Sequence, residues 1–242
     1  MSQASHVGFL LIHGLGSNNK AMKPLEQFLT SQGYVVDNIY LPEFNSTPED
    51  LQAVEWLEWI NYSQERLNIL KDQCNSVYVS GTSSGGVIAL YLCSTNRDLA
   101  GVITFATAVK PFNFISWFVY IFRPIQFIFR WINVGKHREK YIGKFIDWYG
   151  YDRLPMSALI QTARLLDVIG RKLKLVHQPI LLLHGINDRL VPIKTMKQII
   201  RKIKSRDITT VKILEGGHLV LLDRGSNQAL IEIEKWLEKR IG

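Results

Sequence analysis

Short apolar runs alternate with stretches of helical spacing along most of this chain. The apolar runs are Val7–Ile12, Tyr34–Ile39, Val77–Ser80, Gly101–Ala106, Pro179–His184 and Thr209–Leu214. They contain little alternation of polar and apolar residues, which is typical of strands that are covered on both faces. Because strands and helices alternate, the sequence predicts an α/β architecture with a mostly parallel, doubly wound sheet of about six strands.

The segments between these runs carry apolar residues at helical spacing. The predicted helices are Ala21–Ser31, a long helix from Thr47 through Leu70, Gly86–Cys93, Lys194–Ile203 and Asn227–Ile241. The start of the long helix is predicted from Thr47 as a cap, Pro48 at the first helical position, and two acidic residues at the positive helix end.

One connection is far longer than the others. About 70 residues separate Ala106 from the next predicted strand, and a bare loop of that length is uncommon inside a compact domain. We therefore expect Lys110–Val176 to form a helical lid over the carboxyl edge of the sheet. Residues 1–109 and 177–242 then form a single α/β core.

The composition is that of a globular protein. Hydrophobic residues make up 47% of the 242 residues and charged residues 21%, which excludes a disordered chain.

The two cysteines, Cys74 and Cys93, are too few for a disulfide scaffold or a four-ligand zinc site, so both are expected to be reduced thiols. The sequence contains no metal-ligand cluster and no dinucleotide fingerprint, so no cofactor is implied. The polar start of the chain shows no signal peptide, which predicts a cytosolic protein.

Positive charge and aromatic residues both gather in the predicted lid. Residues 123–174 contain eleven Lys and Arg against four acids, so they carry +7 of the net charge of +8. Nine aromatic residues lie between positions 112 and 131, just before and at the start of this charged stretch: Phe112, Phe114, Trp117, Phe118, Tyr120, Phe122, Phe127, Phe129 and Trp131. Two compatible interpretations follow. The aromatics line an apolar acyl pocket, or they enter the surface of an anionic membrane whose head groups meet the Lys and Arg, on the inner side of the membrane. Net positive charge also fits nucleic-acid binding, but no nucleic-acid-binding motif is present.

A glycine-flanked serine marks the strongest candidate for chemistry. Gly81-Thr82-Ser83-Ser84-Gly85 lies between the predicted strand at 77–80 and the predicted helix at 86–93. A nucleophilic serine that turns sharply from a strand into a helix has a strained backbone, and the residues two before and two after it must be small. The pattern alone also fits an ordinary Ser/Gly-rich turn, so the interpretation depends on finding partners for Ser83.

Serine is not nucleophilic at neutral pH and needs a base and an orienting acid. His218 follows Glu215-Gly216-Gly217 after the last predicted strand, where a loop can place its imidazole over the sheet edge. Asp188 supplies a carboxylate from Gly185–Pro192, the loop that leaves the preceding strand. We therefore predict Ser83 as nucleophile, His218 as general base and Asp188 as the acid that orients the histidine.

An acyl-transfer site also needs two N–H groups for the developing oxyanion. The amide of Ser84, at the start of the helix after the nucleophile, is one candidate. The turn His13-Gly14-Leu15-Gly16 after the first strand offers the other, which we assign to Leu15. His13 and His184 each end a strand before a glycine, and both are interpreted as residues of tight turns.

Taken together, these residues resemble the α/β-hydrolase superfamily, and within it the small bacterial carboxylesterases and monoacylglycerol lipases with a helical lid. The resemblance rests on Leu11–Gly16, Gly81–Gly86, Leu183–Pro192 and Gly216–Asp223. It implies an α/β-hydrolase fold with Ser83, Asp188 and His218 in the chain order of that fold, and oxyanion donors at Leu15 and Ser84. These enzymes often carry Gly-His-Gly after the second strand. This chain has Leu41–Asn45 there, so we expect the shape of one pocket wall to differ.

Three functions fit this pattern. The first is hydrolysis of carboxylic esters with an apolar acyl group, such as monoacylglycerols. The second is acyl transfer or thioester hydrolysis by the same residues, because only the acceptor or the leaving group differs. The third is a catalytically silent module that binds a membrane or a partner. A dehalogenase or an epoxide hydrolase would need an aspartate in place of Ser83.

Overall fold

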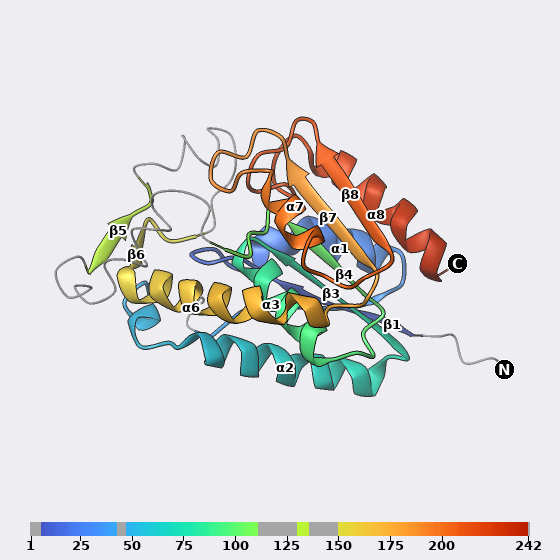
Figure 1. The fold of residues 1–242 in the computed structure, drawn as a ribbon, viewed down its shortest axis with the longest axis horizontal. Helices are drawn as coiled ribbons and strands as arrows, with labels where there is room; N and C mark the ends of the chain where they lie inside the picture. The colour runs from blue at the N-terminus through green and yellow to red at the C-terminus, as the bar shows by residue number, and fades with distance from the viewer. Residues whose placement is uncertain (1–5, 43–46, 111–129, 136–149, 242) are drawn as a thin grey trace.

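A computed structural model describes residues 6–42, 47–110, 130–135 and 150–241. At its centre lies a six-stranded sheet of order β2-β1-β3-β4-β7-β8 in which every pairing is parallel (Figure 1). Its strands are β1 (Val7–Ile12), β2 (Val35–Ile39), β3 (Ser76–Thr82), β4 (Gly101–Phe105), β7 (Ile180–Gly185) and β8 (Ile208–Ile213). The predicted α/β fold with a parallel sheet of about six strands is confirmed.

Helices cover both faces of the sheet (Figure 1). One face carries α1 (Lys23–Ser31) and α8 (Ser226–Ile241). The other carries α2 (Trp56–Gln73), α3 (Ser84–Thr95), α6 (Met156–Lys172) and α7 (Thr195–Ile200). Short 3-10 turns are η1 (Asn19–Met22), η2 (Asp50–Gln52) and η5 (Leu173–Leu175). A separate antiparallel pair joins β5 (Trp131–Asn133) to β6 (Arg153–Pro155).

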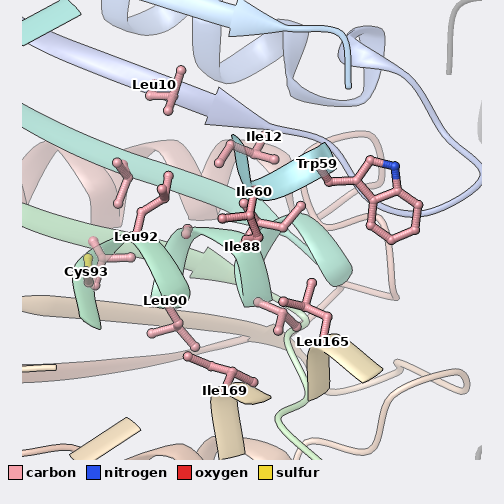
Figure 2. Close-up of a cluster of buried hydrophobic side chains, with 14 of the residues drawn as sticks. Leu10, Ile12, Trp59, Ile60, Ile88, Leu90, Leu92, Cys93, Leu165 and Ile169 are labelled. Carbon is pink, nitrogen blue, oxygen red and sulfur yellow. The ribbon is translucent and has the colours of Figure 1, made fainter. Parts of the chain in front are cut away.

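Successive residues of each strand point to opposite faces of the sheet, so an all-apolar strand packs on both sides. In β1, Phe9 and Leu11 join the apolar cluster with α1 and α8, whereas Leu10 and Ile12 join the cluster with α2 and α3. Figure 2 shows this second cluster, with Leu10, Ile12, Trp59, Ile60, Ile88, Leu90, Leu92, Cys93, Leu165 and Ile169 labelled. The strands are therefore held rigidly, and their carboxyl ends form a fixed edge.

The predicted start of the long helix at Thr47 is wrong, because α2 begins at Trp56. Glu55 and Glu58 form a capping box there, in which each side chain accepts from the other's backbone N–H. The side chain and N–H of Thr47 instead bind the carboxylate of Asp50 (2.6 and 3.0 Å), which closes a local turn before η2. An acidic capping residue is a weaker sequence signal than Thr-Pro, and the stronger signal marked only the short turn.

The structure describes residues 110, 130–135 and 150–176 of the predicted lid. The buried face of α6 includes Ala158, Leu165 and Ile169, which lie in the same apolar cluster as α2 and α3. Helix α6 therefore completes the helical layer on this face of the sheet. Boundaries of a lid at residues 110 and 176 stay a prediction, and eight of the nine aromatic residues, between 112 and 129, lie outside the described residues. None of the described helices combines the length and the hydropathy needed to cross a membrane.

Candidate active site

Ser83 stands directly after β3, at the carboxyl edge of the sheet, and caps the start of α3. Its φ of 54° and ψ of −118° are rare for any residue other than glycine. Its N–H donates to Phe105 O at 2.8 Å, which fixes the turn to the end of β4. The local backbone thus has the strained strand-to-helix geometry predicted for a nucleophile.

The flanking glycines make this turn sterically feasible. A Cβ on Gly81 would lie 2.3 Å from the carbonyl carbon and oxygen of Gly85. A Cβ on Gly85 would lie 2.3 Å from Ile12 O and 2.4 Å from His13 O, both at the end of β1. Real Cβ atoms do not approach backbone atoms this closely, so neither glycine can be replaced without moving the main chain.

Asp188 and His218 lie in contact at the same edge of the sheet. His218 Nδ1 is 2.9 Å from Asp188 Oδ2, and both side chains are almost fully buried. Asp188 comes from the loop after β7, and His218 from the loop after β8. Since β7 and β8 are neighbouring parallel strands, their exit loops meet, although the two residues are thirty positions apart.

Four groups hold the Asp188 carboxylate. Oδ1 accepts from Leu190 N–H and Val191 N–H, each at 2.8 Å, and Oδ2 meets the two imidazoles of His218 and His184. Burial alone would raise the pKa of the Asp188 carboxyl. The charge of His218 and the hydrogen bonds from His184, His218 and Val191 N–H outweigh it, so the pKa lies well below the ordinary value for aspartate. Asp188 is therefore an anion at neutral pH.

His184 is a member of this cluster that the sequence interpretation missed. Its Nε2 lies 2.9 Å from Val191 O and 3.2 Å from Asp188 Oδ2, and its side chain is buried. The signal available in the sequence was the pattern His-Gly-x-x-Asp, which spans a tight turn and can fold the histidine back onto the carboxylate. His184 was interpreted only as a turn residue before Gly185.

Asp223 fixes the loop that carries His218. Its carboxylate accepts from the N–H groups of Gly217 and Gly225. Burial raises its pKa, the two backbone hydrogen bonds oppose this, and the negative charge of Asp188 adds to the rise. The charge of Asp188 therefore acts on Asp223. Within the described residues, however, the Asp223 carboxylate is hydrogen-bonded to the backbone of the loop and not to His218.

The two predicted oxyanion donors lie next to each other. Leu15 N–H donates to the side-chain oxygen of Ser84 at 2.6 Å. The turn before Leu15 is fixed by His13, whose Nδ1 bonds Gly14 O (3.0 Å) and whose Nε2 accepts from Leu41 N–H (3.1 Å). Burial lowers the pKa of His13 to about 4, only partly offset by its bond to Gly14, so this histidine is neutral and structural.

The structure brings Asp188 into contact with His218, brings Leu15 into contact with Ser84, and places Ser83 at the same edge. The Oγ of Ser83 makes no hydrogen bond to any other described residue. Hydrogen bonds between catalytic groups often form or tighten only when substrate binds. Within the described ranges, no three His, Cys, Asp or Glu side chains gather as a metal site would require.

Comparison with known proteins gives the family. Residues 4–225 match the family described as serine aminopeptidase, S33. The chain belongs to this family. It is therefore a hydrolase with the α/β-hydrolase fold.

Two curated relatives of this S33 hydrolase, both from Bacillus, are named as a lipase and a carboxylesterase. It is 26% identical over 240 residues to the thermostable monoacylglycerol lipase of Bacillus sp. (strain H-257), covering 96% of this chain and 89% of the relative. It is 20% identical over 236 residues to a carboxylesterase of Bacillus subtilis (strain 168), covering 95% and 92%.

Solved structures show the same fold. A chain from the work on LipS and LipT, two metagenome-derived lipolytic enzymes, aligns with a TM-score of 0.87 at 20% identity, covering 98% of this chain and 96% of that one. The monoacylglycerol lipase of Paleococcus ferrophilus aligns with a TM-score of 0.74 at 17% identity, covering 96% and 94%. Both alignments cover nearly the whole length of the S33 hydrolase.

Proposed function

We propose that this protein hydrolyses carboxylic esters with an apolar acyl group through an acyl-enzyme on Ser83. The observation that carries the proposal is the buried Asp188–His218 pair, 2.9 Å apart, at the sheet edge where Ser83 leaves β3 with a positive φ. The relatives named monoacylglycerol lipase and carboxylesterase support an ester as substrate. Monoacylglycerols are accordingly the first lipid class to test.

In the proposed reaction Ser83 Oγ attacks the ester carbonyl, and His218 takes the serine proton through Nε2. Nδ1 of His218 is engaged by Asp188, so Nε2 is the nitrogen left for the serine. The imidazolium then protonates the departing alcohol oxygen. Water repeats the sequence on the acyl-enzyme, which releases the carboxylic acid and restores Ser83.

Asp188 contributes orientation and charge. Its low pKa keeps it ionised while His218 gains and loses a proton. The anion fixes the tautomer with the proton on Nδ1 and stabilises the imidazolium that forms. Because Leu190 and Val191 hold the other carboxylate oxygen, the carboxylate cannot rotate away from the histidine.

Charge also develops on the carbonyl oxygen, and the proposed donors for it are the N–H groups of Leu15 and Ser84. Ser84 is the first residue of α3, where backbone N–H groups are free and the helix dipole favours an anion. Each such donor contributes on the order of 3 kcal/mol to transition-state stabilisation.

We also propose that residues 110–176 bring the enzyme to anionic lipid surfaces. Support comes from the overlap of charge and aromatic residues in one segment, with +7 of the net +8 at residues 123–174. In the described part of this segment Arg164, Arg171 and Lys174 are exposed. A pocket lining alone gives no reason for the charge, whereas a membrane interface gives a reason for both features.

The test of the reaction is turnover of p-nitrophenyl acetate, butyrate, octanoate and palmitate, with monoacylglycerols and an acyl-thioester in parallel. We expect hydrolysis of the oxygen esters, a higher kcat/KM for chains longer than acetate, and no turnover by Ser83→Ala. An aminoacyl p-nitroanilide tests the peptidase activity named in the family description. A preference for that amide or for the thioester would overturn the proposed substrate class, and no turnover of any substrate would favour a binding module.

A further inference from the structure

The hydroxyl of Ser84 occupies a position inside the proposed oxyanion site. Leu15 N–H, one of the two proposed donors, points at Ser84 Oγ over 2.6 Å. Ser84 is buried, with 8% of its surface exposed. A substrate oxygen that binds Leu15 N–H therefore arrives next to this hydroxyl.

The turn that carries Leu15 is fixed on two sides. Toward the nucleophile, a Cβ on Gly14 would lie only 3.2 Å from Ser83 Cβ and Thr82 O. On the other side, Tyr151 N–H donates to Gly16 O at 2.9 Å, and Leu154 packs against Gly16. Leu15 N–H is therefore held in place, and the partner free to adjust when a substrate binds is the Ser84 hydroxyl.

The negative charge of a bound oxyanion determines which way the Ser84 hydroxyl proton points. An oxyanion and Ser84 Oγ that share one N–H lie in contact, and their lone pairs repel unless Ser84 turns its proton toward the oxyanion. A serine hydroxyl can accept and donate at once, and its proton rotates freely. In the described part of the chain no hydrogen bond uses the Ser84 proton, since the bond from Leu15 N–H uses only an oxygen lone pair.

We infer that the Ser84 hydroxyl is a third donor to the oxyanion, and so a further catalytic residue. This inference rests on the proposed function. In the free enzyme Ser84 Oγ accepts from Leu15 N–H. In the transition state the hydroxyl donates to the carbonyl oxygen, which gains negative charge as the bond to Ser83 Oγ forms. Hydrogen bonds to an ionised acceptor are about twice as strong as neutral ones, so this contact stabilises the transition state more than the bound ester and acts on kcat.

The test compares Ser84→Ala and Ser84→Cys with a matched control on the same helix. Ser94 is also 8% exposed, and its hydroxyl donates to Tyr91 O at 2.6 Å, far from the proposed site. We expect Ser84→Ala to lower kcat about 100-fold with KM unchanged, and to lower the affinity for a trifluoromethyl ketone transition-state analogue by the same factor. Ser84→Cys keeps the size of the side chain and has a weak S–H donor, so kcat should also fall, by a smaller factor. Ser94→Ala should change neither kcat nor the affinity.

Each other outcome overturns the inference. A wild-type kcat in Ser84→Cys, or in a folded Ser84→Ala, would leave the hydroxyl with a structural role only. A higher kcat in Ser84→Ala would show that the hydroxyl obstructs Leu15 N–H. If Ser84→Ala does not fold, Ser84→Cys decides alone. Failure of the proposed function itself has a different signature, namely ester hydrolysis that survives in Ser83→Ala.

Discussion

At Asp188 four hydrogen-bonding groups meet one buried carboxylate. A buried anion is costly unless it is fully paired, and the backbone of residues 190 and 191 supplies half of that pairing. The other half comes from the two imidazoles. The carboxylate is thereby fixed in position and in charge, which are the two properties that an orienting acid needs.

The charge of Asp188 has a consequence for pH dependence. Because its pKa is well below the ordinary aspartate value, Asp188 stays ionised over the range in which an imidazole takes up a proton, near an ordinary pKa of about 6.5. Acidification should therefore lower kcat/KM through protonation of the general base and not of Asp188, and log kcat/KM should fall with a slope of one. Asp188→Asn should lower kcat about 10⁴-fold at neutral pH. Initial rates on an ester across the pH range measure both effects.

Asp98 provides a control for this prediction. It is an exposed carboxylate at the surface, paired with Lys71, and Asp98→Asn should leave the pH profile unchanged. An acid limb with a slope of two would mean that a second group besides the base takes up a proton over this range. Near-normal activity of Asp188→Asn would move the orienting acid elsewhere, and Asp223 would be the first residue to examine.

Single residues differ in how far sequence could place them. Ser83 could be proposed as a nucleophile from the sequence because such a turn requires glycine at two fixed positions. His184 was missed although the pattern His-Gly-x-x-Asp was present, because a histidine before a glycine also fits a plain turn. The contact of the Ser84 hydroxyl could not be predicted, because it depends on how closely the turn after β1 approaches α3.

Among the secondary-structure elements, the contact between the end of β1 and the start of α3 positions the residues of the candidate site. Gly85 has no room for a Cβ, which would lie 2.3 Å from Ile12 O. Gly85→Ala should therefore force α3 away from β1 and lower the free energy of unfolding by at least about 3 kcal/mol. Urea denaturation followed by circular dichroism measures this change.

Gly170 in α6 is the matched control, since a Cβ there would meet Val109 O at 3.6 Å and Lys202 Nζ at 3.9 Å, which are ordinary contacts. Gly170→Ala should raise the free energy of unfolding by about 0.5–1 kcal/mol, because alanine favours a helix interior. Equal stability of Gly85→Ala and the wild type would contradict the packing described for this junction.

The strands were predictable as elements because a strand covered on both faces is apolar throughout, as in Val7–Ile12, which matches β1 residue for residue. The start of α2 could not be predicted in the same way, because two capping signals eight residues apart, at Thr47 and Glu55, compete. Burial of the residues that follow decides between them. Trp59 and Ile60, near the start of α2, are buried in the core, whereas Thr47 is exposed.

At the scale of the whole molecule, charge is distributed unevenly. With +7 of the net +8 at residues 123–174, the protein should bind phosphatidylglycerol vesicles more tightly than phosphatidylcholine vesicles. Each basic residue near an anionic surface contributes about 1 kcal/mol, and such attraction is screened beyond about 8 Å at physiological salt. Co-sedimentation with vesicles at low and high salt should show binding to phosphatidylglycerol that weakens as salt rises.

Substitution of exposed basic residues gives the control for this experiment. Arg164, Arg171 and Lys174 changed together to Gln should weaken binding to phosphatidylglycerol at low salt, with ester hydrolysis in solution retained. Weak binding that is equal for both lipids at every salt concentration would contradict the proposed membrane contact.

If Ser83 is a nucleophile activated by His218, as we propose, it should react with a covalent probe for activated serines. A fluorophosphonate reacts with an activated serine and marks the residue by mass. We expect one adduct on the wild type, located at Ser83 by peptide mass spectrometry, and no adduct on a Ser83→Ala variant whose circular dichroism spectrum is unchanged. Labelling that persists in Ser83→Ala, or an adduct on a different residue of the wild type, would contradict the proposal.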